Sequence, residues 1–191
     1  MRLFVAIDLP ESVKERLALL CCGLPGARWV DPDQIHLTLR FIGEVDGGLF
    51  RDIRDVLATT EGECFSLQLS GIGFFPPRGK PRVIWAGLQR NESLLKLRNR
   101  MESRLVDLGL EPEGRKFSPH ITLARLKNTP TIKIVRFLEA HSQFRSNPFI
   151  VENFHLYSSI LGRKGAVHRI EVSYPLAENA YAPTNSDVGR K

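Results

Sequence analysis

The sequence predicts an α+β fold of two similar βαβαβ-type lobes, related by a pseudo-two-fold axis, with antiparallel-rich sheets facing a central cleft. The first observation behind this prediction is a repeated four-residue pattern, HLTL at 36–39 and HITL at 120–123, separated by 84 positions. The second is that strand-like and helix-like segments follow one another in the same order around both copies. The third is a further strand-like pair, 65–70 and 149–154, at the same offset.

The first half contains each element of the unit. Residues 2–9 alternate as a strand does, and Pro10 suits the start of a helix whose stripe contains Val13, Leu17 and Leu20. The first motif supplies the next strand. Residues 49–58 then read as a helix, ahead of the strand at 65–70.

The second half repeats this order. Residues 82–88 are strand-like, Asn91 is a suitable cap for a helix that Gly109 ends, and the second motif follows. Thr129 before Pro130 predicts a capped helix running to about residue 141. The last strand, 169–173, is the expected counterpart of 82–88.

Length and composition predict a single bilobal domain over 1–177, with one motif in each half, and a disordered polar tail over 178–191. The net charge of +6 favours an anionic partner. Cys21, Cys22 and Cys64 lack metal-ligand spacing and indicate a reducing compartment without a disulfide framework. No apolar run is long enough for a secretion signal or a membrane span, so we expect a cytoplasmic location and no membrane partner.

The repeated motif carries the chemistry. In a strand, alternate side chains point to opposite faces, so each His and its Thr share one face while the aliphatic residues occupy the other. A lone His on a strand is more often structural, but two matched copies predict a site with two imidazoles and two hydroxyls. Such a set is suited to acid–base chemistry on a phosphate. A slip of one residue would bury the polar pair, so the aliphatic residues fix the register.

With their flanks at 28–43 and 118–126, the two motifs resemble the two-histidine (HxTx) phosphoesterase superfamily, and within it the bacterial and archaeal RNA 2′,3′-cyclic phosphodiesterases, historically called 2′-5′ RNA ligases. The resemblance runs from residue 2 to about 176. It implies metal-independent hydrolysis of an RNA terminal 2′,3′-cyclic phosphate to a 2′-phosphomonoester. The expected partner is therefore an RNA with a cyclic phosphate end, tRNA fragments included.

The resemblance also implies roles for the motif residues. His36 is expected to donate a proton to the leaving ribose oxygen, and His120 to act as the base that activates water. The two roles exchange when the reaction runs backwards, which would give 2′-5′ ligation. Thr38 and Thr122 are expected to donate hydrogen bonds to the non-bridging phosphate oxygens.

Four further residues are candidates for substrate binding. Arg40 shares a face with His36 by strand alternation, although a solvated strand-end charge is the alternative. Phe41 and Phe75 are suited to stacking on a base, with core packing as the alternative. Arg125 has the wrong parity for a regular strand, so it reaches the site only if the strand ends or bulges at Ala124, although the resemblance favours it.

No metal or cofactor is expected. His141, His155 and His168 have no ligand spacing and are predicted to be structural or surface residues. The basic, glycine-containing stretch 71–80 lacks the GxxxxGK[ST] pattern, so it predicts a loop bordering an RNA channel and no nucleotide cofactor.

Two other classes of function fit parts of the sequence, and we expect a monomer in each case. A non-catalytic RNA-binding module explains the basic charge and leaves the paired motifs unexplained. A phosphoesterase of small cyclic nucleotides, or a protein that binds a small phosphorylated ligand, uses the same cleft with another substrate.

Overall fold

The computed structural model describes residues 1–162 and 165–178. Helices α1 to α4 span Glu11–Ala18, Gly47–Ala58, Glu92–Asp107 and Thr131–Ala140, and a 3₁₀ turn covers Pro32–Gln34. Strands β1 to β5 span Arg2–Asp8, Ala27–Trp29, His36–Glu44, Phe65–Leu67 and Leu69–Phe75. Strands β6 to β10 span Val83–Leu88, His120–Leu126, Phe149–Val151, Asn153–Gly162 and Gly165–Pro175.

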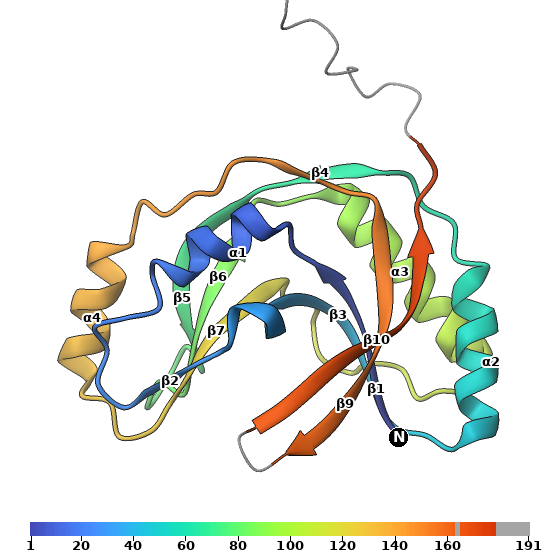
Figure 1. Cartoon of the computed structure of the whole chain (residues 1–191), viewed down its shortest axis with the longest axis horizontal. Coiled ribbons are helices and arrows are strands. Elements are labelled where there is room, and N and C mark those ends of the chain that lie inside the picture. Colours follow the sequence, from blue (N-terminus) through green and yellow to red (C-terminus); the bar gives the residue numbers. More distant parts are fainter. Residues whose placement is uncertain (163–164, 179–191) are drawn as a thin grey trace, which may run out of the picture.

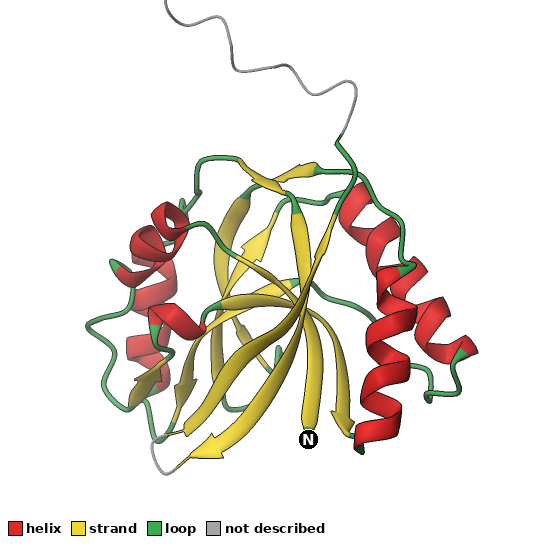
Figure 2. Cartoon of the chain, turned by 45° about the vertical axis from the view of Figure 1, so that its right-hand side comes forward, coloured by secondary structure: helices red, strands yellow, loops and turns green. Residues whose placement is uncertain are grey.

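Two four-stranded antiparallel sheets form the centre of the fold. The first sheet has the order β10-β9-β1-β3 and the second the order β2-β7-β6-β5, while β4 and β8 pair separately. Helices α2 and α3 cover the first sheet, and α1 and α4 cover the second (Figure 1). The sheets lie between the two helix pairs, so their uncovered faces turn toward each other (Figure 2). The predicted two-lobed α+β architecture is confirmed.

The two lobes exchange elements between the halves of the sequence. The first sheet takes β9 and β10 from the second half, and the second sheet takes β2 and β5 from the first half. The helices are exchanged too, since α3 packs on α2 and on β3, while α1 and residues 146–147 after α4 line one hollow. A lobe is therefore not a contiguous half of the chain.

The last strand also differs from expectation. β10 pairs only with β9 and forms an edge, whereas β6 lies between β5 and β7. The structural counterpart of β6 is β1, which lies between β9 and β3. Matching 169–173 to 82–88 was wrong, because alternation in a sequence shows that a strand has two faces and does not show which strands flank it.

The aliphatic residues of both motifs are buried. Leu37, Ile121 and Leu123 are fully inaccessible and Leu39 nearly so, within the main core that the helices cover. Burial of each such side chain stabilises the fold by about 1.5–3 kcal/mol. As predicted, this packing fixes the register that leaves His and Thr on the opposite face.

Side-chain caps were predicted for two helices, and one of the two predictions is confirmed. The Asn91 side chain accepts a hydrogen bond from the Leu94 amide at 2.8 Å and caps α3, as predicted. The cap predicted at Thr129 is wrong, because α4 begins after Pro130 without a side-chain cap.

No helix in the part of the chain described here is long and apolar enough to cross a membrane. The predicted tail lies, except for residue 178, outside the described residues.

Candidate active site

His36 and His120 are the first residues of β3 and β7, strands of different sheets that contact each other. The Nδ1 atom of His36 lies 2.9 Å from the Gln34 carbonyl oxygen, and that of His120 lies 2.7 Å from the Ser118 carbonyl oxygen. Because a carbonyl only accepts, each Nδ1 is the donor in its hydrogen bond. Each ring is thus oriented by a hydrogen bond to the carbonyl two residues upstream, and its Nε2 remains available for proton transfer.

The two threonines occupy matching places. Thr38 lies opposite Ala6 on β1, and Thr122 lies opposite Trp85 on β6. Both side chains are partly exposed, and within 1–162 and 165–178 neither hydroxyl has a protein hydrogen-bond partner. Each hydroxyl is therefore available to a ligand.

Each motif strand contains a bulge one residue beyond its threonine. On β3, Arg40 pairs with Val5 and Thr38 with Ala6, which leaves Leu39 without a partner. A bulge adds one residue to one strand, so the alternation of side chains reverses beyond it.

The same break occurs on β7. Ala124 pairs with Ile84 and Thr122 with Trp85, so Leu123 is the extra residue. Beyond it Ala124 is buried and Arg125 is exposed on the motif face. Arg125 was expected to reach the motif face only if the strand ended or bulged at Ala124. The strand does bulge, at Leu123 and not at Ala124. Phe41, also five residues after its histidine, occupies the corresponding position on β3.

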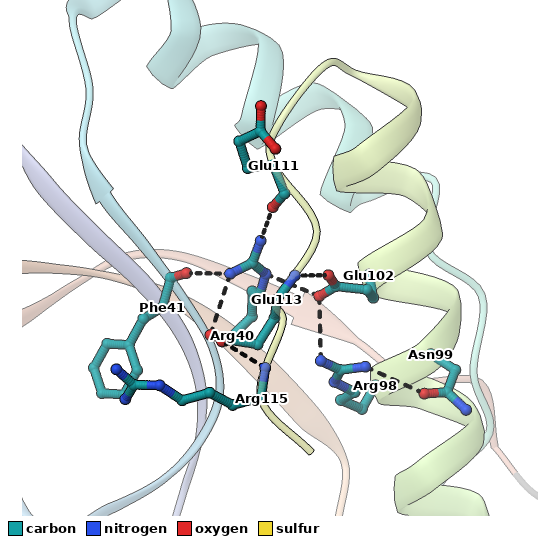
Figure 3. A network of polar contacts seen from close by, with 8 residues as sticks. All are labelled: Arg40, Phe41, Arg98, Asn99, Glu102, Glu111, Glu113 and Arg115. Atoms are coloured by element: carbon teal, nitrogen blue, oxygen red, sulfur yellow. Dashed lines mark hydrogen bonds and ion pairs between the residues drawn. The ribbon is translucent and has the colours of Figure 1, made fainter. Parts of the chain in front are cut away.

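The expectation that Arg40 shares the face of His36 was wrong, because the bulge turns it into the protein. Its Nε atom lies 2.8 Å from Oε2 of Glu102 on α3, and its Nη1 lies 3.5 Å from Oε2 of Glu113 (Figure 3). Its Nη2 donates to the Glu111 carbonyl. Arg40 is 9% exposed, so it is neither a solvated strand-end charge nor a residue facing the site.

This network connects the strands of the two histidines. Glu102 accepts a hydrogen bond at 2.7 Å from the backbone amide of Glu113, and its other oxygen lies 3.4 Å from Arg98. Residues 111–118 lead directly into β7 and include the Ser118 carbonyl that orients His120. Through Arg40, β3 holds this segment in place (Figure 3).

Aromatic rings surround His36. Its ring centroid lies 4.8 Å from that of Phe4 and 5.8 Å from that of Tyr157. Burial lowers the pKa of His36 from 6.5 to about 4, which outweighs the opposite effect of its hydrogen bond to Gln34. His36 is therefore neutral at pH 7.

An ion pair lies beside the same histidine. Asp8 is the β1 residue paired with His36, and it contacts the Lys14 ammonium at 2.9 Å. The Lys14 side chain is only 10% exposed. The Asp8 charge raises the pKa of His36, and the Lys14 charge lowers it.

His120 has its own pair of rings. Phe75 meets it edge-on at 4.9 Å between centroids, and Trp85 lies at 6.5 Å. By register, Phe75 on β5 opposite Val83 corresponds to Tyr157 on β9 opposite Phe4. Each sheet therefore places one ring from its exchanged strand beside its histidine.

Neither phenylalanine proposed for substrate contact belongs to the main core. Phe41 is 59% exposed and its ring lies 5.9 Å from that of Phe4, and Phe75 is partly exposed beside His120. Base stacking by either residue stays a prediction.

His168 was not expected at the site. Its ring meets His36 edge-on at 5.2 Å between centroids, and its amide donates to Oε1 of Gln34 at 2.7 Å. Burial lowers its pKa. No local pattern could have revealed this, because the β9–β10 pairing brings His168 to a residue far away in the sequence. Phe4, Tyr157 and Trp85 were missed for the same reason.

Within the described ranges, no group of three or more His, Cys, Asp or Glu side chains could hold a metal ion.

The two-lobed fold and the matched histidine–threonine pairs are typical of a phosphoesterase that has one HxTx motif in each half of its chain. The family described as LigT like Phosphoesterase matches residues 7–85 and 87–168, and the chain belongs to this family.

Two relatives with similar sequences share one name, and a solved structure has a similar fold. An Archaeoglobus fulgidus protein named RNA 2′,3′-cyclic phosphodiesterase is 33% identical over 174 residues, which cover 88% of this chain and 97% of the relative. A Thermotoga maritima protein of the same name is 35% identical over 176 residues, 89% and 92% of the two chains. The crystal structure of a Thermus thermophilus protein superposes with a TM-score of 0.78 at 30% identity, covering 93% of this chain and 99% of the other.

Proposed function

We propose that this protein hydrolyses the terminal 2′,3′-cyclic phosphodiester of RNA to a 2′-phosphomonoester, without a metal, by acid–base catalysis with His36 and His120. The observation that carries the proposal is the identical fixing of both imidazoles, with Nδ1 bound to the carbonyl two residues upstream. Two imidazoles with available Nε2 atoms, on contacting strands, are the pair that opening a cyclic phosphate requires. The names of the relatives support RNA as the substrate.

The reaction needs two proton transfers on opposite sides of the phosphorus. His120 takes a proton from water as the water attacks, and His36 gives a proton to the departing ribose 3′-oxygen. Burial keeps His36 neutral at pH 7, and a phosphate anion bound against its ring favours the protonated form and raises its pKa. Substrate binding thus charges the acid.

The remaining site residues bind the phosphate and the nucleoside. Thr38 and Thr122 donate their free hydroxyls to the non-bridging oxygens, where negative charge gathers in the transition state. Arg125 supplies a guanidinium on the same face. Phe41 and Phe75 offer rings to the base. Arg40 is left out of this set and acts through the 111–118 segment.

In 2′-5′ ligation an RNA 5′-hydroxyl would attack the cyclic phosphate in place of water, so His120 would take the hydroxyl proton and His36 would again protonate the leaving 3′-oxygen. The two histidines would exchange roles only when the 2′-5′ bond is cleaved back to the cyclic end. We place this chemistry on RNA fragments, including tRNA fragments, by a monomer in the cytoplasm. The net charge of +6 supports an RNA partner, and three free cysteines support a reducing compartment.

The test is incubation with an oligoribonucleotide ending in a 2′,3′-cyclic phosphate, followed by identification of the phosphate position in the product. We expect a 2′-monoester, unaffected by a chelator, and a loss of at least about 10²-fold in kcat for both His36→Ala and His120→Ala. RNA binding without product would favour a binding module. Turnover of cyclic mononucleotides alone would favour a small-molecule esterase.

The role of each histidine is tested with a substrate whose leaving 3′-oxygen is replaced by sulfur, which departs without protonation. We expect this substrate to restore turnover in His36→Ala and not in His120→Ala. Rescue of His120→Ala alone would reverse the assignment.

A further inference from the structure

A concave surface includes Phe75, whose ring meets the ring of His120. The turn between β5 and β6, together with the ends of both strands, lines an open, shallow hollow of about 680 Å³. We call residues 75–83 the β5–β6 hairpin. Phe75, Arg78, Lys80, Arg82 and Val83 line the hollow, along with two prolines.

The hairpin carries positive charge that its surroundings do not neutralise. Arg78, Lys80 and Arg82 are all exposed. Across residues 1–162 and 165–178, none of them forms an ion pair with a carboxylate, and the Lys80 ammonium contacts only the Asn128 side-chain oxygen, at 3.4 Å. Three exposed cations without acidic partners favour an anionic ligand.

The positive surface extends across the second sheet. Val83, which lines the hollow, pairs with Arg125 on β7, and Arg125 pairs with Arg28 on β2. Directly paired residues lie on one face of a sheet. Arg125 and Arg28 therefore continue the charge of the hairpin toward the motif face of β7.

Phe75 joins the hollow to the catalytic face. Its ring is part of the wall of the hollow and also meets the His120 ring at 4.9 Å between centroids. An RNA with a 2′,3′-cyclic end continues only on the 5′ side of that nucleotide, so its other phosphates leave the site along one path. The hairpin lies next to His120 and offers cations spaced along such a path.

We propose that the β5–β6 hairpin binds the phosphates of the nucleotides that precede the cyclic end of a single-stranded RNA, and so makes the enzyme prefer oligonucleotides to mononucleotides. This inference rests on the function proposed above. Phe75 separates the two parts of the surface: cyclic phosphate chemistry on the histidine side and strand binding on the cationic side. Aromatic and cationic side chains together are a common platform for single-stranded nucleic acids.

The test compares two substrates, a nucleoside 2′,3′-cyclic monophosphate and a hexaribonucleotide ending in a 2′,3′-cyclic phosphate. The variant R78A/K80A/R82A removes the hairpin charges. The matched control R51A/K133A/R136A removes three exposed cations from α2 and α4, on the outer sides of the molecule. Thermal unfolding checks that both variants are folded.

We expect kcat/KM for the hexanucleotide to fall roughly tenfold or more in the hairpin variant, through KM, while that for the mononucleotide stays within about twofold. Its dependence on salt should flatten, since each lost phosphate contact lowers the log–log slope by about 0.7 for a single strand. The control should keep the oligonucleotide preference. If the triple variant does not fold, the single reversal R78E provides the same comparison.

Equal losses on both substrates, or an unchanged preference for the hexanucleotide, would overturn the hairpin proposal. A wild type that opens neither substrate would overturn the proposed function instead. In that case, binding of a hexanucleotide with a 2′-phosphate end, measured by fluorescence anisotropy, still decides the hairpin proposal. Weaker binding in the hairpin variant but not in the control would support it, and equal binding in the two variants would reject it.

Discussion

At the residue scale, His36 and His120 each donate Nδ1 to the carbonyl two residues upstream, but they differ in the side chains around them. Phe4, Tyr157 and His168 pack around His36, whereas Phe75 and Trp85 lie beside His120. Enclosure by rings removes water from His36 and favours its neutral form. Burial among these rings thus lowers the pKa of His36 below that of a solvated imidazole.

The lowered pKa of His36 predicts a dependence of stability on pH. The pKa is about 4 in the folded protein and near 6.5 when the chain is unfolded, so the unfolded state binds more protons between these values. The free energy of unfolding should fall as pH drops from 6.5 to 4, and the His36 contribution is about 3 kcal/mol. Urea unfolding of His36→Asn should show a flatter curve than wild type over this range. Parallel curves would contradict the prediction.

The buried Arg40 network predicts a large effect of a residue outside the motif face. Arg40→Met leaves Glu102 and Glu113 without their main cation and should lower the free energy of unfolding by about 3 kcal/mol. Because the 111–118 segment loses its anchor, kcat should fall as well. Arg54→Met, which breaks the exposed pair with Asp55, is the control and should leave the free energy of unfolding nearly unchanged. Similar small losses in both variants would mean that the network contributes little.

At the scale of elements, strand alternation predicted the faces of His36 and Thr38 and failed two residues later. The sequence around Leu39 and Leu123 contains no turn residue that would mark a bulge, since the bulge arises from pairing with β1 and β6. Arg40 was therefore misplaced by local reasoning, and Arg125 could be placed only conditionally. A helix start was easier to predict where a side chain caps a nearby backbone amide, as Asn91 does for Leu94.

Strands β5 and β6 approach closely where Gly73 lacks a side chain. A Cβ atom on Gly73 would overlap the Trp85 indole, which packs against the strand at that point. Gly73→Ala should force Trp85 to move toward its neighbours, destabilise the fold by about 1–3 kcal/mol and lower kcat through His120. The smaller ring in G73A/W85F should restore part of both losses. Gly114→Ala, with no neighbour within 4 Å of the added atom, should be close to neutral; equal effects of Gly73→Ala and Gly114→Ala would contradict this.

At the scale of the whole molecule, the sequence predicted two lobes and could not assign their strands. The repeat at an offset of 84 reveals like units, but nothing in residues 65–75 or 149–162 shows which sheet they join. The same long-range choice brings Tyr157 and His168 to His36. Those contacts depend on pairing between distant segments and leave no local trace.

Because each sheet contains two strands from the other half, the lobes should not unfold separately. Loss of the first sheet releases β9, and with it the β4–β8 pair that joins the two halves. Calorimetry should show one transition with equal calorimetric and van't Hoff enthalpies. Two resolved transitions would show that the lobes are independent despite the exchange.

The exchange of β5 and β9 also bears on how such a chain could have arisen. An ancestor of half this length would complete neither sheet alone, and it would reach this arrangement only as two identical copies that swap a strand and a helix. Fusion of two such copies into one polypeptide would remove the need for assembly. In a single fused chain each motif imidazole can have its own neighbours, as the histidine at 168 beside one and the indole at 85 near the other illustrate.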